Sequence, residues 1–123
     1  MKNLPFHILR IGLGITFLWI GVLIFQAPEV WGGFIQEWAR PFIPIPIVQA
    51  MIGAAILDII VGILLLVNVF TWVAGFLGAL HIGVVLITVG INDVTVRDIG
   101  LFAAAAFIGL SKLPKKYVFW LKK

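Results

Sequence analysis

Residues 47–91 read IVQAMIGAAILDIIVGILLLVNVFTWVAGFLGALHIGVVLITVGI, and this stretch decides the fold. It holds two apolar runs, 47–68 and 71–91, and a membrane-spanning helix takes about 20 predominantly apolar residues. Only a short connection around Asn68-Val69-Phe70 joins the runs, so the sequence predicts two antiparallel spanning helices that form a tight hairpin.

The rest of the chain has the same apolar character. Of its 123 residues, 63% are hydrophobic and 11% are charged, whereas a soluble domain carries about 25% charged residues. So few charges could not cover a surface that faces water, and lipid is therefore expected to surround most of the molecule. With further apolar runs at about 6–27 and 98–110, the sequence predicts an all-α fold, a single integral membrane four-helix bundle covering residues 1–123.

The connection between the first two spans, residues 28–46, is expected to contain a short amphipathic helix that lies in the membrane interface. Its apolar side chains fall on one helical face, while its charged side chains gather elsewhere. Trp31 and Trp38 would anchor this helix among the lipid headgroups, and Trp120 would anchor the C-terminal tail. The prolines of the run 41–46 cannot continue a helix, so an extended segment is predicted before the second span.

The basic residues predict the orientation, because cytoplasmic loops carry an excess of Lys and Arg. Lys2 and Arg10 lie near the same side as a cluster of C-terminal lysines, whereas the opposite side has Arg40 and Arg97. The cluster comprises Lys112, Lys115, Lys116, Lys122 and Lys123. Both termini are therefore predicted to be cytoplasmic, in a cell membrane, and the cluster suits anionic lipid headgroups better than nucleic acid.

Composition excludes several kinds of site. The chain has no cysteine, which rules out disulfides, thiolate metal sites, iron–sulfur clusters and cysteine nucleophiles. Its two histidines, His7 near the cytoplasmic surface and His81 within a span, cannot supply three nitrogen ligands at one depth. We therefore expect no metal, no catalytic residue in this chain by itself, and no cofactor apart from a bound lipid or quinone.

Asp58 and His81 form the main candidate site. Because they lie at nearly equal distances from the hairpin turn, antiparallel helices place them at the same depth, where an ionisable side chain is costly and indicates function by default. Arg10 could reach inward toward Asp58 or extend to the cytoplasmic interface. Two interpretations stay open: a polar cluster that fixes helix register, or a proton or quinone site.

Arg97 and Asp98 precede and begin the fourth span. We expect them to form an ion pair at the outer face, since a carboxylate in a first helical turn is favoured by the macrodipole and by free backbone donors. The alternative interpretation is a functional site that bridges this turn to the connection 28–46.

Small residues recur at four-residue spacing in the third and fourth spans. They are Gly75, Ala79 and Gly83, then Gly100 and Ala104, and Ala105 and Gly109. Such stripes let helix backbones approach closely in a membrane. We expect packing within the chain, with a homo-oligomer seam as the alternative.

Several of these motifs, in this order and spacing, resemble the DoxX-like family of small four-helix membrane proteins. The matching positions are Arg10, Gly14, Phe17, Trp19, Gly21 and Pro28, then Asp58, Gly62, Leu64, Leu65, Leu66, Phe70 and Thr71, and finally Arg97, Asp98, Ile99, Gly100 and Leu101. The resemblance covers nearly the whole chain. It implies a four-helix bundle and a link to respiratory redox chemistry, since some relatives are described as the small subunit of a thiosulfate:quinone oxidoreductase.

The function expected from these observations is that of a small accessory subunit of a respiratory or quinone-linked membrane complex. It would bind lipid or quinone between helices near Asp58, His81 and Arg10. Two rivals remain: a small proton-coupled transporter that uses Asp58, and a homo-oligomeric structural membrane protein.

Overall fold

The computed structural model describes residues 3–92 and 95–114, and within these ranges the chain contains helices and no strand. The elements are α1 (Leu4–Gln26), α2 (Pro28–Gly32), the 3-10 helix η1 (Glu37–Phe42), α3 (Ile47–Val67), α4 (Thr71–Val89) and α5 (Asp98–Ser111). Helices α1, α3 and α4 are long and apolar enough to cross a membrane. Helix α5 is apolar but shorter, with 14 residues. We refer to α1, α3, α4 and α5 together as the four long helices. They begin and end within about two residues of the predicted runs.

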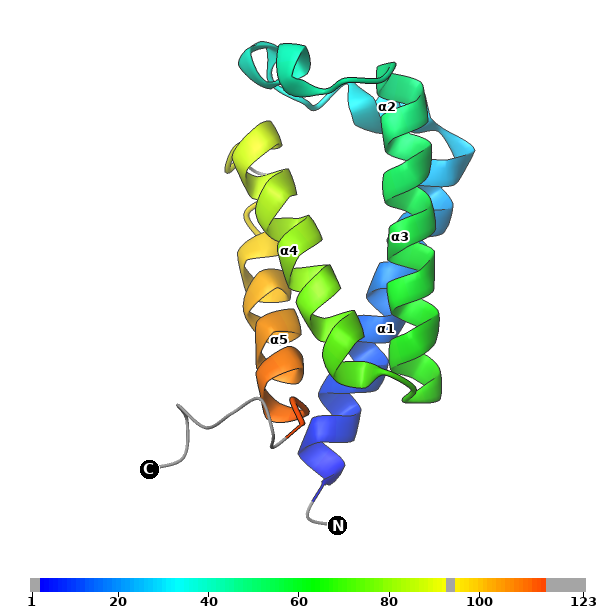
Figure 1. The fold of residues 1–123 in the computed structure, drawn as a ribbon, viewed down its shortest axis with the longest axis vertical. Coiled ribbons are helices and arrows are strands. Elements are labelled where there is room, and N and C mark those ends of the chain that lie inside the picture. Colours follow the sequence, from blue (N-terminus) through cyan, green and yellow to red (C-terminus); the bar gives the residue numbers. More distant parts are fainter. Residues whose placement is uncertain (1–2, 93–94, 115–123) are drawn as a thin grey trace.

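The long helices pack as two antiparallel pairs, α1 with α3 and α4 with α5 (Figure 1). Helices α3 and α4 share the turn at 68–70 but diverge from it, so the expected tight hairpin is limited to the turn. We call the end of the molecule with this turn the turn end. The opposite end, where residues 27–46 join α1 to α3, is the connection end.

Glycines determine which helices pair. A Cβ atom added to Gly62 in α3 would lie 2.8 Å from the carbonyl oxygen of Gly14 in α1, and one added to Gly75 in α4 would lie 2.5 Å from the backbone nitrogen of Gly109 in α5. The backbones therefore touch, as small residues allow in a membrane. The expected packing within the chain is confirmed at this second seam, whereas a Cβ added to Gly100 meets nothing within 4 Å.

The turn between α3 and α4 reverses the chain with two residues in the left-handed region. Asn68 has φ 59° and Phe70 has φ 48°. Asparagine adopts this region more readily than most residues do. The hydroxyl of Thr71 donates a hydrogen bond of 2.6 Å to the Asn68 side chain. The turn is thus held by its own side chains.

The connection from α1 to α3 differs from the expected single amphipathic helix. It contains two short pieces, α2 and η1, separated around Gly33. Adjacent glycines at 32 and 33 lower helix propensity there, and a Cβ added to Gly32 would lie 2.5 Å from Ile47, so this glycine also lets the connection pack on α3. The connection then crosses the connection end (Figure 1), and the backbone N–H of Gln36 donates a 2.9 Å hydrogen bond to the Thr88 carbonyl of α4.

Candidate intramembrane binding site

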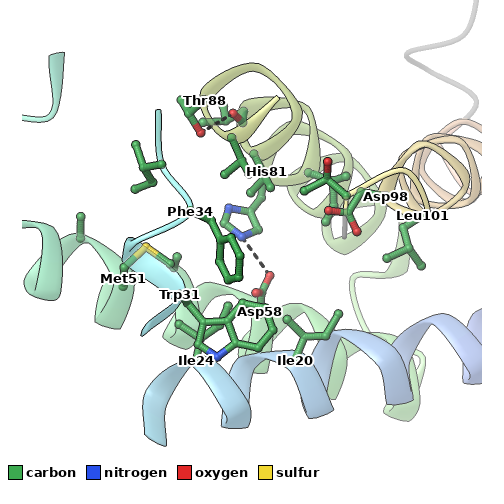
Figure 2. A pocket seen from close by; sticks show the side chains of 18 of the residues that line it. Ile20, Ile24, Trp31, Phe34, Met51, Asp58, His81, Thr88, Asp98 and Leu101 are labelled. Carbon is green, nitrogen blue, oxygen red and sulfur yellow. Dashed lines mark hydrogen bonds and ion pairs between the residues drawn. The ribbon is translucent and has the colours of Figure 1, made fainter. Parts of the chain in front are cut away.

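A cavity of about 680 Å³ lies between the two helix pairs. All four long helices and the α1–α3 connection contribute to its wall, which is mostly apolar (Figure 2). Ligand pockets in proteins typically enclose about 300–1,000 Å³ and combine apolar walls with a few polar groups. In size and composition, this cavity therefore resembles the small-molecule pockets of other proteins.

The cavity is closed toward the turn end. Phe17 of α1 is 2% exposed, and its ring would lie 2.9 Å from a Cβ added to Gly78 of α4. Val61 and Leu65 of α3, both completely buried, belong to the same core cluster. This cluster fills the bundle between the cavity and the turn. Toward the connection end, the cavity is lined by residues of the connection, including Trp31.

Asp58 and His81 face each other inside the cavity (Figure 2). The Nε2 atom of His81 lies 3.2 Å from Oδ1 of Asp58, and Asp58 is 2% exposed. The structure thus brings together the two residues whose equal depth the sequence predicted, each from near the middle of its helix. A facing arrangement removes both polar groups from lipid, where each would be costly.

The contact between these two side chains is short without being a well-aligned hydrogen bond. In the described part of the chain, no donor reaches Oδ1 of Asp58 with hydrogen-bond geometry, although the His81 ring nitrogen is within ion-pair distance. A buried carboxyl oxygen without a donor is unusual in a native structure and calls for a partner.

Arg10 does not join this pair, which corrects the expected grouping of Arg10 with Asp58 and His81. Its Nη1 donates hydrogen bonds of 2.5 Å and 3.1 Å to the carbonyls of Leu65 and Leu66, and its Nε donates one of 3.1 Å to His7. The last carbonyls of a helix lack partners and carry partial negative charge. Because α1 packs on α3, those carbonyls are closer to Arg10 than Asp58 is, and they take its donors.

Arg97 and Asp98 do not form the expected ion pair, although both belong to the described residues and both line the cavity. Adjacent residues at a helix start point in different directions, so their charged groups do not face each other. Figure 2 shows Asp98 directed to the cavity from α5. The pair is therefore part of the cavity wall.

The predicted tryptophan anchors have different environments. Trp31 is half-buried and lines the cavity, since α2 follows α1 after a single residue and packs on α3. Trp38 is 53% exposed, as an interfacial anchor would be, and its indole N–H donates to the Gln36 side chain. Trp120 lies outside the described residues.

Sequence reasoning missed three threonines of the cavity wall, Thr16, Thr88 and Thr95. Each hydroxyl donates to a backbone carbonyl: Thr16 to Gly12 at 2.9 Å, Thr88 to Val84 at 2.9 Å, and Thr95 to Gly90 at 2.5 Å. Polar residues within two apolar runs were the available signal for Thr16 and Thr88. For Thr95 the sequence offered none, because its burial depends on how the chain turns before α5.

Within residues 3–92 and 95–114, no group of three or more His, Asp or Glu side chains could hold a metal ion. Comparisons with protein-family models, with curated proteins and with solved structures found no match to this chain. The cavity and its polar groups are therefore the features of this chain from which a function can be inferred.

Proposed function

We propose that this chain is a four-span membrane protein that binds a lipid-soluble quinone or lipid in its cavity, as an accessory subunit of a quinone-linked oxidoreductase. The observation that carries the proposal is the mostly apolar cavity with Asp58 and His81 facing each other in its wall. A ring with two polar oxygens and an apolar tail matches such a wall. The resemblance to the DoxX-like family, with its link to respiratory redox chemistry, supports the choice of a quinone.

Helix α5 serves as the fourth span in this proposal. Its 14 residues extend roughly 21 Å at about 1.5 Å per residue, less than the roughly 30 Å of a hydrocarbon core. Close packing on α4 through Gly75 and Gly109 supports its place in the bundle. The polar residues that precede it, Thr95 and Arg97, then lie at the connection end of the cavity.

In the proposed orientation both termini lie in the cytoplasm, and the distribution of basic residues supports it. The chain has no cysteine, so single cysteines can be introduced without background. Cysteine at Gly33 or Asn92 should react with an impermeant maleimide added outside intact cells, and cysteine at Lys123 should react only after lysis. The reverse pattern would contradict this orientation.

Two measurements test the proposed function. In native membranes solubilised with mild detergent, the protein should migrate together with redox subunits, and migration alone would contradict the accessory role. In purified form it should bind a short-chain quinone or its quinol, measured by calorimetry. Asp58→Leu should weaken binding of at least one of the two forms, whereas Glu37→Leu, which changes an exposed acid outside the cavity, should not.

A second function, proton-coupled transport, is favoured by one observation. The cavity is closed toward the turn end by Phe17 and its neighbours and extends toward the connection end, as in a transporter open to one side. In proteoliposomes with a trapped pH dye, proton movement driven by an imposed membrane potential should then require Asp58. Movement that persists unchanged in Asp58→Asn would remove this candidate.

A further inference from the structure

The polar groups of the cavity wall are dominated by hydrogen-bond acceptors. The hydroxyl protons of Thr16, Thr88 and Thr95 are already donated to backbone carbonyls, so these side chains offer only lone pairs to a ligand. Asp58 and Asp98 add carboxyl oxygens. A ligand that fits this wall must bring donors of its own.

The wall has few side-chain hydrogen-bond donors, and one of them, Arg97, lies away from the middle of the cavity. They come from His81, Trp31 and Arg97. Arg97 precedes α5 and is exposed, whereas Asp58 lies in the middle of α3 and is buried. Among the described residues no donor makes a hydrogen bond to Oδ1 of Asp58; the His81 ring nitrogen lies 3.2 Å away without hydrogen-bond geometry.

Formal charge leads to the same conclusion. Two acids and one arginine line the cavity, so with both carboxyls ionised and His81 neutral the wall carries one net negative charge. An anionic ligand would meet this charge unfavourably, and a ligand that only accepts hydrogen bonds would leave the Asp58 carboxyl without a partner. Burying such a group unpaired is what makes polar sites discriminate strongly between otherwise similar ligands.

We propose that the ligand donates a hydrogen bond to Asp58, so that the cavity selects the hydroxyl-bearing quinol over the quinone, which has acceptors only. This inference rests on the proposed function, since it names the form of the ligand that the same cavity takes. The ring hydroxyl points at the Asp58 carboxyl, and the apolar tail lies along the wall toward the connection end.

The test compares three compounds with one ring on the purified protein in nanodiscs. They are a one-isoprene benzoquinone, its quinol kept reduced by dithionite, and the dimethyl ether of that quinol, which has the same shape without donors. Calorimetry should give a Kd for the quinol about tenfold or more below those of the other two, as expected for one hydrogen bond to a carboxyl group. Tetraphenylphosphonium, a lipophilic cation without N–H or O–H donors, tests charge separately and should bind more weakly than the quinol.

Variants of Asp58 locate the preference. In Asp58→Leu the three compounds should bind within about twofold of one another, while Glu37→Leu, outside the cavity, should keep the tenfold preference. Circular dichroism checks that each variant is folded. Should Asp58→Leu not fold, Asp58→Asn decides the matter: its amide both donates and accepts, so the preference for quinol should shrink or reverse.

Each outcome has a distinct meaning. The donor inference would be overturned if all three rings bound equally, if the quinone bound more tightly than the quinol, or if the phosphonium did. In each case the proposed quinone binding would stand as long as the quinone itself binds. A preference for quinol that survives in Asp58→Leu would overturn the assignment to Asp58. If none of the rings binds to the unmodified protein, the proposed quinone binding fails, and the inference fails with it.

Discussion

The two ends of this small bundle differ in how the space between the helix pairs is filled. At the turn end, Phe17 and fully buried Val61 and Leu65 fill the interior, and Arg10 satisfies the last carbonyls of α3. Toward the connection end the helix pairs separate around a cavity that holds a carboxyl oxygen without a donor. The turn end is closely packed, whereas under the proposed function the cavity takes up a ligand. Substitutions in the two regions should therefore differ in kind.

The largest effect is expected at the seam between α4 and α5. A side chain at Gly75 would run into backbone atoms of Ala105 and Gly109, which cannot move aside as a flexible side chain can. Overpacking typically costs about 1–3 kcal/mol, and rigid neighbours place Gly75→Leu at about 3 kcal/mol or above. Unfolding by SDS in mixed micelles, followed by circular dichroism, measures the loss.

Gly100→Leu provides the matched control on the same helix pair, since a Cβ there meets nothing within 4 Å. Its free energy of unfolding should change by less than about 0.5 kcal/mol. Similar losses in both variants would mean that α4 and α5 do not make the close contact described above.

The next effect compares two arginines, one in each region. Arg10 is 7% exposed and donates to two backbone carbonyls, whereas Arg97 is exposed at the cavity. Hydrogen bonds from a charged group contribute about 1.5–3 kcal/mol, so Arg10→Met should lower the free energy of unfolding by about 2 kcal/mol. Arg97→Met should change it by less than about 0.5 kcal/mol. Equal effects would erase the contrast between the two ends.

A smaller effect is expected for Asp98→Ala. Asp98 lies in the first turn of α5, which has no side-chain hydrogen bond at its N-cap, so we expect the helix dipole to supply most of its stabilising contribution. That interaction is worth about 0.3–1 kcal/mol, and the loss should fall in this range. Association with partner subunits should persist; folded protein that no longer assembles would instead assign Asp98 to a partner-binding site.

Little or no loss of stability is expected for Asp58→Leu, despite the deep burial of Asp58. In the described part of the chain Oδ1 of Asp58 accepts no hydrogen bond, so Asp58→Leu removes a buried polar group that lacks a donor, and the free energy of unfolding should stay within about 1 kcal/mol of the unmodified protein or rise above it. Ligand binding should change at the same time. A loss of several kcal/mol would mean that the Asp58–His81 contact holds the bundle together, and would place it with the turn end.

The helices were predictable because the length of an apolar run is a property of the sequence itself, and the bounds of α3 and α4 follow from the runs on either side of Asn68. The common depth of Asp58 and His81 was predictable for a related reason, since two helices that share a turn keep equal distances from it. Both predictions need only the lengths of the apolar runs and the fact that two antiparallel helices run equal distances from the turn they share.

The hydrogen-bond partner of Arg10 and the cavity could not be predicted from the sequence, because both depend on how the helices pack. Arg10 binds backbone carbonyls, which every residue has, so no side-chain pattern identifies Leu65 and Leu66 as the acceptors. The cavity arises because Gly62 and Gly75 draw α3 and α4 toward different neighbours. The inward position of Trp31 depends in turn on that cavity, since without it the indole would have no space to enter.

The bond between Arg10 and α3 also bears on how the protein enters the membrane during synthesis. Helix α1 leaves the ribosome first, and the carbonyl that Arg10 binds most closely belongs to a residue 55 positions later in the chain. Until that residue has been made, the guanidinium must find water or headgroups, which it reaches by extending from a position one to two turns inside the helix. In the proposed orientation those headgroups are on the cytoplasmic side. The same arginine would then first hold α1 at the correct depth in the membrane and later donate hydrogen bonds to the carbonyls of α3.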